Sequence, residues 1–237
     1  MKILAIDTTG VAASAAVVSD GKLLAEEVLN YKLTHSQTIM PLVDDVLKKT
    51  ETDLKTVDYI ACSEGPGSFT GLRIGAATAK GLALGLNKKI ITVPTLDVLA
   101  YNIFGTENII CPIMDARRAQ VYSAFYCWEG DQLKRLSDYM AVSIDVIVEK
   151  ALEFNKKVIF LGDGVAVNRA KLEGNESFFM APASLMIQKA SSLAVAAEVK
   201  ALKGEAINGS DFEVMYLRKS QAEREREEKL AAEEDKK

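Results

Sequence analysis

The stretch Ile3-Leu4-Ala5-Ile6-Asp7-Thr8-Thr9-Gly10 decides the fold. Its apolar run, which ends in a polar turn with a glycine, predicts a short buried strand. Residues 12–18 predict a second strand, and the turn Ser19-Asp20-Gly21-Lys22 predicts that it pairs antiparallel with residues 23–29. The stretch from Ile109 to Asp115 has the same pattern, an apolar run that ends in an aspartate. This recurrence predicts two halves that begin in the same way.

The other predicted elements support a duplication of architecture without a repeat of sequence. The first half continues with a helix at 35–49, a strand at 59–63, a helix at 71–86, a strand at 89–93 and a helix to about 104. The second half contains strands at 109–114, 120–127 and 132–139, a helix at 143–154, a strand at 157–161, a short helix, a strand near 178 and a helix at 184–203. Both halves are therefore predicted as βββαβαβα. We predict an α/β chain with an N-terminal domain at 1–104, a C-terminal domain at 105–217 and a charged tail at 218–237.

The composition argues against several classes of protein. The formal net charge of −4 argues against a chain that binds nucleic acid on its own, because such binding normally uses a basic surface. Cys62, Cys111 and Cys127 form no Cys-x-x-Cys pair, which indicates a reducing compartment. No stretch approaches the roughly 18 uninterrupted apolar residues of a membrane span, so we expect a soluble, cytoplasmic chain. The charged tail predicts a solvated helix or a disordered segment, with a helix that orders on a partner as the alternative.

Two loops are candidates for binding phosphate. A strand-end carboxylate followed by hydroxyls, as in Asp7-Thr8-Thr9, can hold Mg²⁺ and a phosphate group. The alternative is a tight turn whose side chains bond to their own backbone. The loop from Glu64 to Gly75 (EGPGSFTGLRIG) can present backbone N–H groups to an anion at the start of a helix. It lacks the Gly-Lys-Ser/Thr of a Walker loop, and a flexible helix entry capped by Ser68 or Thr70 is the favoured interpretation.

Small residues follow two rows along the helix predicted at 71–86. One row contains Gly71, Gly75, Ala79 and Ala83, and the other contains Ala77, Gly81 and Gly85. A glycine inside a helix costs up to ~1 kcal/mol relative to alanine, so the close approach of another backbone is the expected compensation. That neighbour is either the chain's own sheet or another chain. Internal packing is the expected interpretation for one of the two rows.

The sequence is poor in residues for metal or nucleophilic chemistry. His35 is the only histidine, and Ile39 stands where a His-x-x-x-His pair would have its second ligand. Because the cysteines are dispersed as well, we expect no metal site. A Ser-His-Asp or Cys-His arrangement would need His35 itself as the base.

Several stretches resemble the TsaB (YeaZ) family, accessory proteins of bacterial tRNA threonylcarbamoyladenosine synthesis. These stretches are residues 3–9, Thr34-His35-Ser36-Gln37 with Met40-Pro41, residues 65–75, Met114-Asp115-Ala116-Arg117-Arg118 with Val121-Tyr122, and Tyr216-Leu217-Arg218. The Gly-Pro-Gly-Ser-Phe-Thr-Gly-x-Arg block is the most specific of them. The resemblance covers nearly the whole chain and is weakest at 129–180 and in the tail. Asp7-Thr8-Thr9 also resembles the first phosphate loop of actin, sugar kinases and heat-shock chaperone ATPases.

The resemblance implies a duplicated actin-like (ASKHA, ribonuclease H-like) fold and a non-catalytic role. It implies support for a catalytic paralogue, TsaD, which holds a metal through a His-x-x-x-His pair and transfers threonylcarbamoyl to an adenosine beside the anticodon. The resemblance also implies an ATPase, TsaE, as a further partner. The chain is expected to meet tRNA only within the complex, and we expect it to bind no membrane. No cofactor is required, and weak or vestigial ATP or ADP binding is left open at Asp7, Thr8 and Thr9.

The family pairs with TsaD through its first two helices, here about 35–48 and 71–86. On these helices the expected contact residues are Ser36, Ile39, Met40, Val43, Arg73, Ala76, Ala77 and Lys80. An exposed smooth apolar face would also favour a homodimer of the isolated chain.

Two other functions remain as alternatives. The first is an ATP-dependent small-molecule kinase that uses Asp7 and Asp115 for Mg²⁺ and phosphate, which the poor adenosine loop Gly162-Asp163-Gly164 disfavours. The second is a metalloprotease, which conflicts with the missing ligand pair.

Overall fold

The structure is a computed structural model that describes residues 1–31 and 33–218. The tail predicted from residue 218 lies outside the described residues, apart from Arg218 itself. In this part of the chain, none of the helices combines the length and apolar character needed to cross a membrane.

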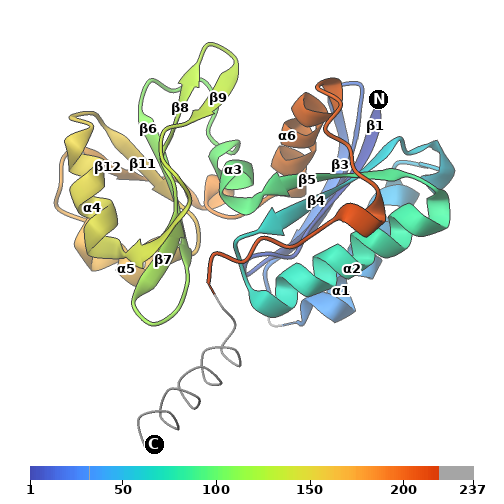
Figure 1. Cartoon of the computed structure of the whole chain (residues 1–237), viewed down its shortest axis with the longest axis horizontal. Coiled ribbons are helices and arrows are strands. Elements are labelled where there is room, and N and C mark those ends of the chain that lie inside the picture. The colour runs from blue at the N-terminus through green and yellow to red at the C-terminus, as the bar shows by residue number, and fades with distance from the viewer. Residues whose placement is uncertain (32, 219–237) are drawn as a thin grey trace, which may run out of the picture.

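The first half forms one sheet with helices on both faces (Figure 1). Its elements are β1 (Lys2–Asp7), β2 (Ala13–Ser19), β3 (Lys22–Leu29), α1 (His35–Lys49), β4 (Tyr59–Gly65), α2 (Phe69–Leu86), β5 (Lys89–Pro94) and α3 (Thr95–Ala100). The strand order is β3-β2-β1-β4-β5, with β1, β2 and β3 antiparallel and β4 and β5 parallel to β1. This half has the predicted βββαβαβα order.

The second half repeats this sheet. Its elements are β6 (Ile109–Asp115), β7 (Gln120–Ser123), β8 (Tyr126–Glu129), β9 (Gln132–Arg135), β10 (Met140–Ser143), α4 (Ile144–Glu153), β11 (Val158–Leu161), α5 (Gly164–Leu172), β12 (Phe178–Met180) and α6 (Ala190–Leu202). The order β10-β7-β6-β11-β12 places each strand where the first half has its counterpart. The duplicated α/β fold is confirmed. The strand predicted at 120–127 is instead two strands, and the second of them begins an added β8–β9 hairpin that pairs with β6 at Ile110↔Tyr126.

The last helix is the main departure from the predicted domain boundary. We expected a helix at 184–203 that completes the second half, but α6 begins at Ala190 and packs on the first sheet. Leu193 of α6 belongs to the core cluster of Ile3 and Ile91. The chain then stays with the first half, because Ile207 pairs with Ile90. The segment from Ala190 to 217 therefore covers the first half and does not belong to the second.

The physical reason lies in the two faces of the first sheet. Side chains alternate along β1, so Leu4 and Ile6 face one core cluster while Ile3 and Ala5 face the other. Helices α1 and α2 cover the first of these faces. On the other face the first half supplies only the short helix α3, and the alanine-rich α6 fills the remaining space.

The two small-residue rows of α2 face in different directions. An added Cβ at Gly71 would lie 2.0 Å from the carbonyl oxygen of Thr8, and one at Gly75 would lie 2.6 Å from the Thr8 hydroxyl. At Gly81 and Gly85 nothing lies within 4 Å. The first row therefore lets α2 dock on the end of β1, and the second row is open to solvent.

Candidate functional site

The turn after β1 is closed by its own hydrogen bonds. Asp7 is 1% exposed; its carboxylate accepts hydrogen bonds from the Thr9 backbone N–H and the Thr9 hydroxyl, both at 2.8 Å, and from the Ser63 hydroxyl. The Thr8 hydroxyl donates to the carbonyl oxygen of Gly71 at 2.7 Å. Burial raises the pKa of Asp7, and the bonds from Ser63 and Thr9 partly offset this. The groups proposed for a vestigial nucleotide site at Asp7, Thr8 and Thr9 are therefore used internally.

A cleft of about 910 Å³ lies between the two halves, where the strand ends of both sheets meet. The first half contributes the turn at Thr9 and Gly10 and the loop and first turn of α2. At the start of α2 the Ser68 hydroxyl accepts a hydrogen bond from the Gly71 N–H at 3.3 Å, as predicted for a helix cap. The second half contributes the turn after β6 and Asp163. The cleft therefore joins the two repeated strand-end turns.

The turn after β6 has an unusual backbone. Arg117, Arg118 and Ala119 have φ values of +63°, +54° and +56°, the left-handed region that costs a non-glycine residue roughly 1–2 kcal/mol. Asp115 accepts a hydrogen bond from the Arg117 N–H at 2.7 Å and forms an ion pair with the Arg117 guanidinium at 3.2 Å. Its own N–H donates to Asp163 at 3.0 Å. The turn thus holds two exposed arginines at the edge of the cleft.

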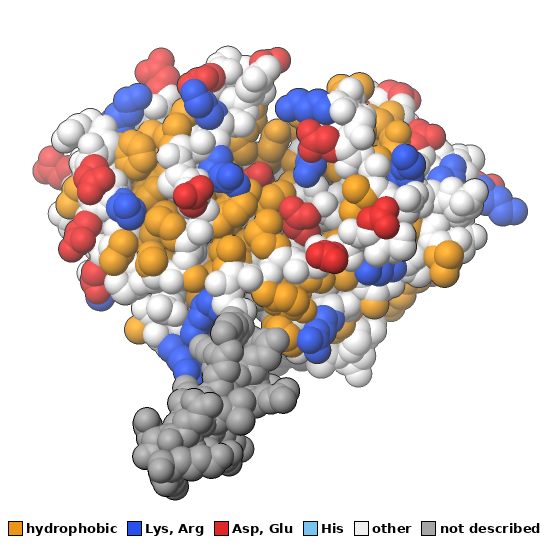
Figure 2. Space-filling view, viewed as in Figure 1, with side chains coloured by type: hydrophobic (Ala, Val, Ile, Leu, Met, Phe, Trp, Pro, Cys, Tyr) orange, Lys and Arg blue, Asp and Glu red, His pale blue; other side chains and the backbone are white. Residues whose placement is uncertain are grey.

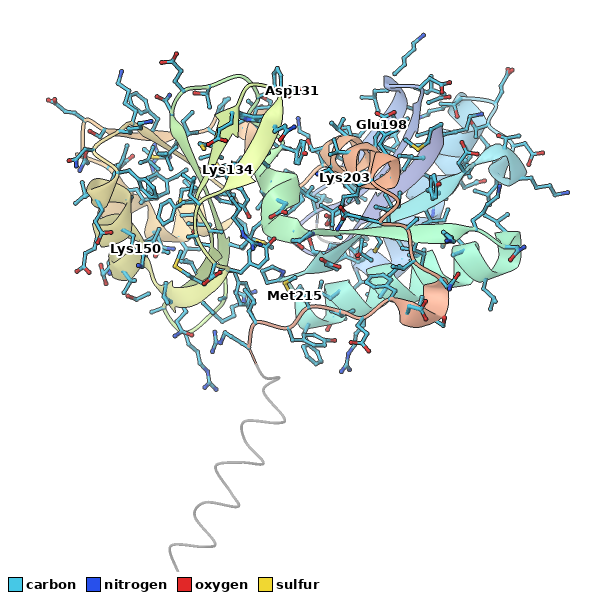
Figure 3. The ribbon with its side chains drawn as sticks, turned by 45° about the horizontal axis from the view of Figure 1, so that its top comes forward. Asp131, Lys134, Lys150, Glu198, Lys203 and Met215 are labelled. Carbon is cyan, nitrogen blue, oxygen red and sulfur yellow. The ribbon has the colours of Figure 1, made fainter. Side chains whose placement is uncertain are left out.

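The C-terminal part of the described chain crosses the cleft. Figure 3 labels Met215 on the segment that runs between the two halves. The Met215 N–H donates to the Glu64 carbonyl at 2.7 Å, and Tyr216 stacks on Phe69 with 4.7 Å between ring centroids. The Arg218 guanidinium then donates to the carbonyl oxygens of Ala116 and Arg117 in the second half. We call residues 212–218 the C-terminal strap.

A second bridge between the halves was not found by sequence reasoning. Asp97 of α3 accepts hydrogen bonds from the hydroxyls of Tyr126 at 2.7 Å and Tyr139 at 2.8 Å. Burial raises the pKa of Asp97, and the two phenols partly offset this. The guanidinium of Arg135 lies 4.0 Å from the Tyr139 ring centroid. The partners are 29 and 42 positions apart in the sequence, so no local motif marks them.

The residues predicted to contact a partner fall into exposed and buried sets. Ser36, Met40, Arg73 and Ala77 are exposed, and Lys80 is half-buried. The structure corrects the prediction for the remaining three, Ile39, Val43 and Ala76, which are 1%, 1% and 6% exposed within the chain's own core. Their side chains pack in the core cluster of the first sheet. These three side chains cannot reach another protein while the helices remain docked.

His35 has a structural role in the first half. Its Nε2 lies 2.9 Å from the carbonyl oxygen of Gly10. Among the residues that the structure describes, no group of three His, Cys, Asp or Glu side chains is placed to hold a metal ion. Gly162 and Gly164 serve close packing, because a Cβ at either would meet the carbonyl oxygen of Ile113 at 2.1 Å or 2.9 Å.

Known proteins resemble this chain in both sequence and structure. A family model described as "TsaD: tRNA N6-adenosine threonylcarbamoyltransferase" matches residues 22–226. The chain is 34% identical over 173 residues to the "tRNA threonylcarbamoyladenosine biosynthesis protein TsaB" of Bacillus subtilis. The aligned region is 73% of this chain and 76% of the relative. The chain belongs to the TsaB family.

Solved structures agree with this TsaB-family assignment at the level of the fold. YeaZ from Pseudomonas aeruginosa superposes with a TM-score of 0.77 at 23% identity, over 91% of this chain and 99% of that one. An activator of 2-hydroxyisocaproyl-CoA dehydratase from Clostridium difficile, with bound ADPNP, superposes with a TM-score of 0.50 at 13% identity, over 86% and 97% of the two chains. The TsaB-family chain therefore has the duplicated actin-like fold that the family resemblance implies.

Proposed function

We propose that this TsaB-family chain acts in tRNA threonylcarbamoyladenosine biosynthesis as a non-catalytic subunit that binds a TsaD-type transferase. The observation that carries the proposal is the solvent-facing row of α2, Ala77, Gly81 and Gly85, together with the exposed side chain of Met40 on α1. A helix surface without side-chain bulk allows another helix to approach closely. Because Gly81 and Gly85 have no neighbour within 4 Å, internal packing does not account for their cost in helix stability.

The exposed set refines the contact that we propose. It contains Ser36, Met40, Arg73, Ala77 and the open glycines of α2, with Leu84 at 86% exposed near the far end of the helix. Lys80 lies at the edge of this face, because its ammonium is 5.7 Å from the Phe212 ring of the C-terminal strap. An apolar helical face of this kind is the type that an actin-like paralogue, or a second copy of the chain, can cover. We propose the transferase as the working partner, the homodimer as the state of the isolated chain, and a TsaE-type ATPase as a protein that joins the complex.

The non-catalytic character is supported by the state of the candidate chemical groups. The Asp7 carboxylate accepts hydrogen bonds from Thr9 and Ser63, and His35 contacts a backbone carbonyl. No cofactor is required for a role that rests on surface contact. A small-molecule kinase is the alternative, and ATP-dependent phosphorylation of an added sugar or metabolite by the purified chain would favour it.

The test places charges on the exposed row of α2. Ala77→Glu combined with Gly81→Glu should abolish capture of the TsaD-type transferase, a loss of at least about a hundredfold in affinity, because unpaired charges would be buried at the contact. The matched control is Ala166→Glu with Ala170→Glu, two exposed residues with the same spacing on α5. The control pair should bind like the parent chain. Undiminished capture by the α2 variant would contradict the proposed interface.

A further inference from the structure

The rim of the cleft carries a local excess of positive charge. Four arginines line it, Arg73 from α2, Arg117 and Arg118 from the turn after β6, and Arg218 from the C-terminal strap. The lining carboxylates are those of Asp115 and Asp163, so four positive and two negative groups leave a formal charge of +2. The whole chain has a formal net charge of −4. Basic residues from three separate elements therefore converge at one place on an acidic protein.

Aromatic rings are interleaved with these arginines. Tyr216 stacks on Phe69 at 4.7 Å, and the Arg73 guanidinium lies 4.1 Å from the centroid of the Phe69 ring. Tyr216 is 43% exposed, and Arg73 donates to its hydroxyl at 3.2 Å. Guanidinium groups that contact phosphate, next to rings on which bases can stack, are the usual elements of a surface that binds single-stranded nucleic acid.

The backbone holds two of the arginines outward. The turn after β6 is held by hydrogen bonds from the Ala116 N–H to the Gln120 carbonyl at 3.0 Å and from the Gln120 N–H to the Arg117 carbonyl at 3.2 Å. Arg218 fastens the same turn from the C-terminal strap. The Arg117 side chain is 87% exposed. Arg118 is exposed too, and within residues 1–31 and 33–218 it forms no ion pair.

We propose that this rim, defined by Arg73, Arg117, Arg118, Arg218, Phe69 and Tyr216, binds the phosphate backbone of single-stranded RNA. The exposed positions of Arg73, Arg117 and Arg118 favour a long polyanion over a small phosphate ligand, which would need donors inside the cleft. There Thr9 already donates both its backbone N–H and its hydroxyl to Asp7. Because the chain as a whole is acidic, the basic surface is confined to this rim. A partner therefore supplies the rest of the binding surface for tRNA. The inference rests on the proposed role in tRNA modification, and its rim shares only Arg73 with the α2 face.

The test removes the two arginines of the turn. Arg117→Asn with Arg118→Asn keeps a residue type that tolerates the left-handed backbone. The control, Lys150→Gln with Lys156→Gln, removes the same charge from exposed positions on or next to α4, away from the cleft (Lys150 is labelled in Figure 3). Binding of a labelled single-stranded RNA and of whole tRNA to the full chain is measured by fluorescence anisotropy at several salt concentrations, and folding of each variant by denaturant unfolding.

We expect the arginine variant to bind at least about tenfold more weakly at low salt, with the slope of log K against log salt reduced by about 1.4 for two lost phosphate contacts. The control should bind like the parent chain. Equal weakening of both variants, or no RNA binding by the parent chain at about 20 mM salt, would overturn the inference. Binding of ATP but not RNA by the parent chain, lost in the arginine variant, would overturn it in favour of a small phosphate ligand. The arginine variant should still capture the transferase. A failure of the RNA-binding inference can therefore be distinguished from a failure of the proposed α2 interface.

Discussion

The two halves of the chain share one strand order but end their first strands in opposite ways. After β1, Asp7 is buried and accepts three hydrogen bonds. After β6, the Asp115 side chain is 21% exposed and pairs with an arginine at the edge of the cleft. The donors that reach the two carboxylates explain the difference. Thr9 and Ser63 of β4 donate to Asp7 in the core, whereas Asp115 pairs with Arg117, whose side chain is 87% exposed. We call the turn after β1 the closed turn and the turn after β6 the open turn, because only the first buries its aspartate.

The largest expected effect tests the closed turn directly. Asp7→Ala leaves the Thr9 N–H and the hydroxyls of Thr9 and Ser63 without their acceptor, so we expect the free energy of unfolding to fall by about 3 kcal/mol. Asp115→Ala at the open turn should cost about 1 kcal/mol, because its ion pair faces solvent. Urea unfolding of both variants measures the contrast. Equal losses would mean that the two turns are equivalent after all.

The glycines of α2 sharpen the comparison. Gly71→Ala should destabilise by about 2 kcal/mol, because its Cβ would overlap the backbone of the closed turn. Gly81→Ala, in the same helix with nothing within 4 Å, should instead stabilise by about 0.5–1 kcal/mol. Denaturant unfolding gives both values. A loss at Gly81 as large as at Gly71 would show that the outer row also packs within the chain.

The pH dependence of stability reports on the buried carboxyl. The raised pKa of folded Asp7 means that the unfolded chain loses this proton first, near the usual value of 3.8. Stability is therefore lost as pH rises from that value through the folded pKa. Asp7→Asn removes this dependence, so its stability relative to the parent should improve as pH rises from about 4. If the difference in unfolding free energy between Asp7→Asn and the parent chain did not change with pH, the raised pKa of Asp7 would be contradicted.

The smallest effect concerns the backbone of the open turn. Ala119→Gly should stabilise the chain by about 0.5–1 kcal/mol, because glycine adopts the left-handed region without strain. Val11→Gly, in the turn after β1, should give no such gain, since no positive φ occurs there among the described residues. Thermal unfolding distinguishes the two. Destabilisation by Ala119→Gly would mean that the turn is not strained.

Local patterns in the sequence predict much of this fold. Apolar runs that end in Asp7 and Asp115 mark the first strand of each half, and Ser68 caps a helix as predicted. The destination of the last helix could not be predicted, because α6 is rich in alanine and apolar nearly all round. Such a helix carries no stripe that identifies the sheet on which it packs.

The candidate site was less predictable for the same kind of reason. The spacing of Ile39 and Val43 shows that one helical face is apolar, but it does not show whether a sheet or a partner covers that face. The arginine rim depends on the C-terminal strap, which brings Arg218 to a turn about one hundred residues earlier in the sequence. The hydrogen bond from the Tyr139 hydroxyl to Asp97 likewise joins positions that only the folded chain brings together.

The return of α6 to the first sheet has a consequence for synthesis on the ribosome. One face of that sheet, which includes Ile3, Ala16 and Ile91, has to wait for Leu193 and its neighbours to complete its cover. These residues emerge nearly one hundred positions after β5 ends, a delay of about 5–20 s at ordinary rates of elongation. During that interval the nascent chain leaves this apolar face of the first sheet only partly covered, and chaperones can bind such a surface.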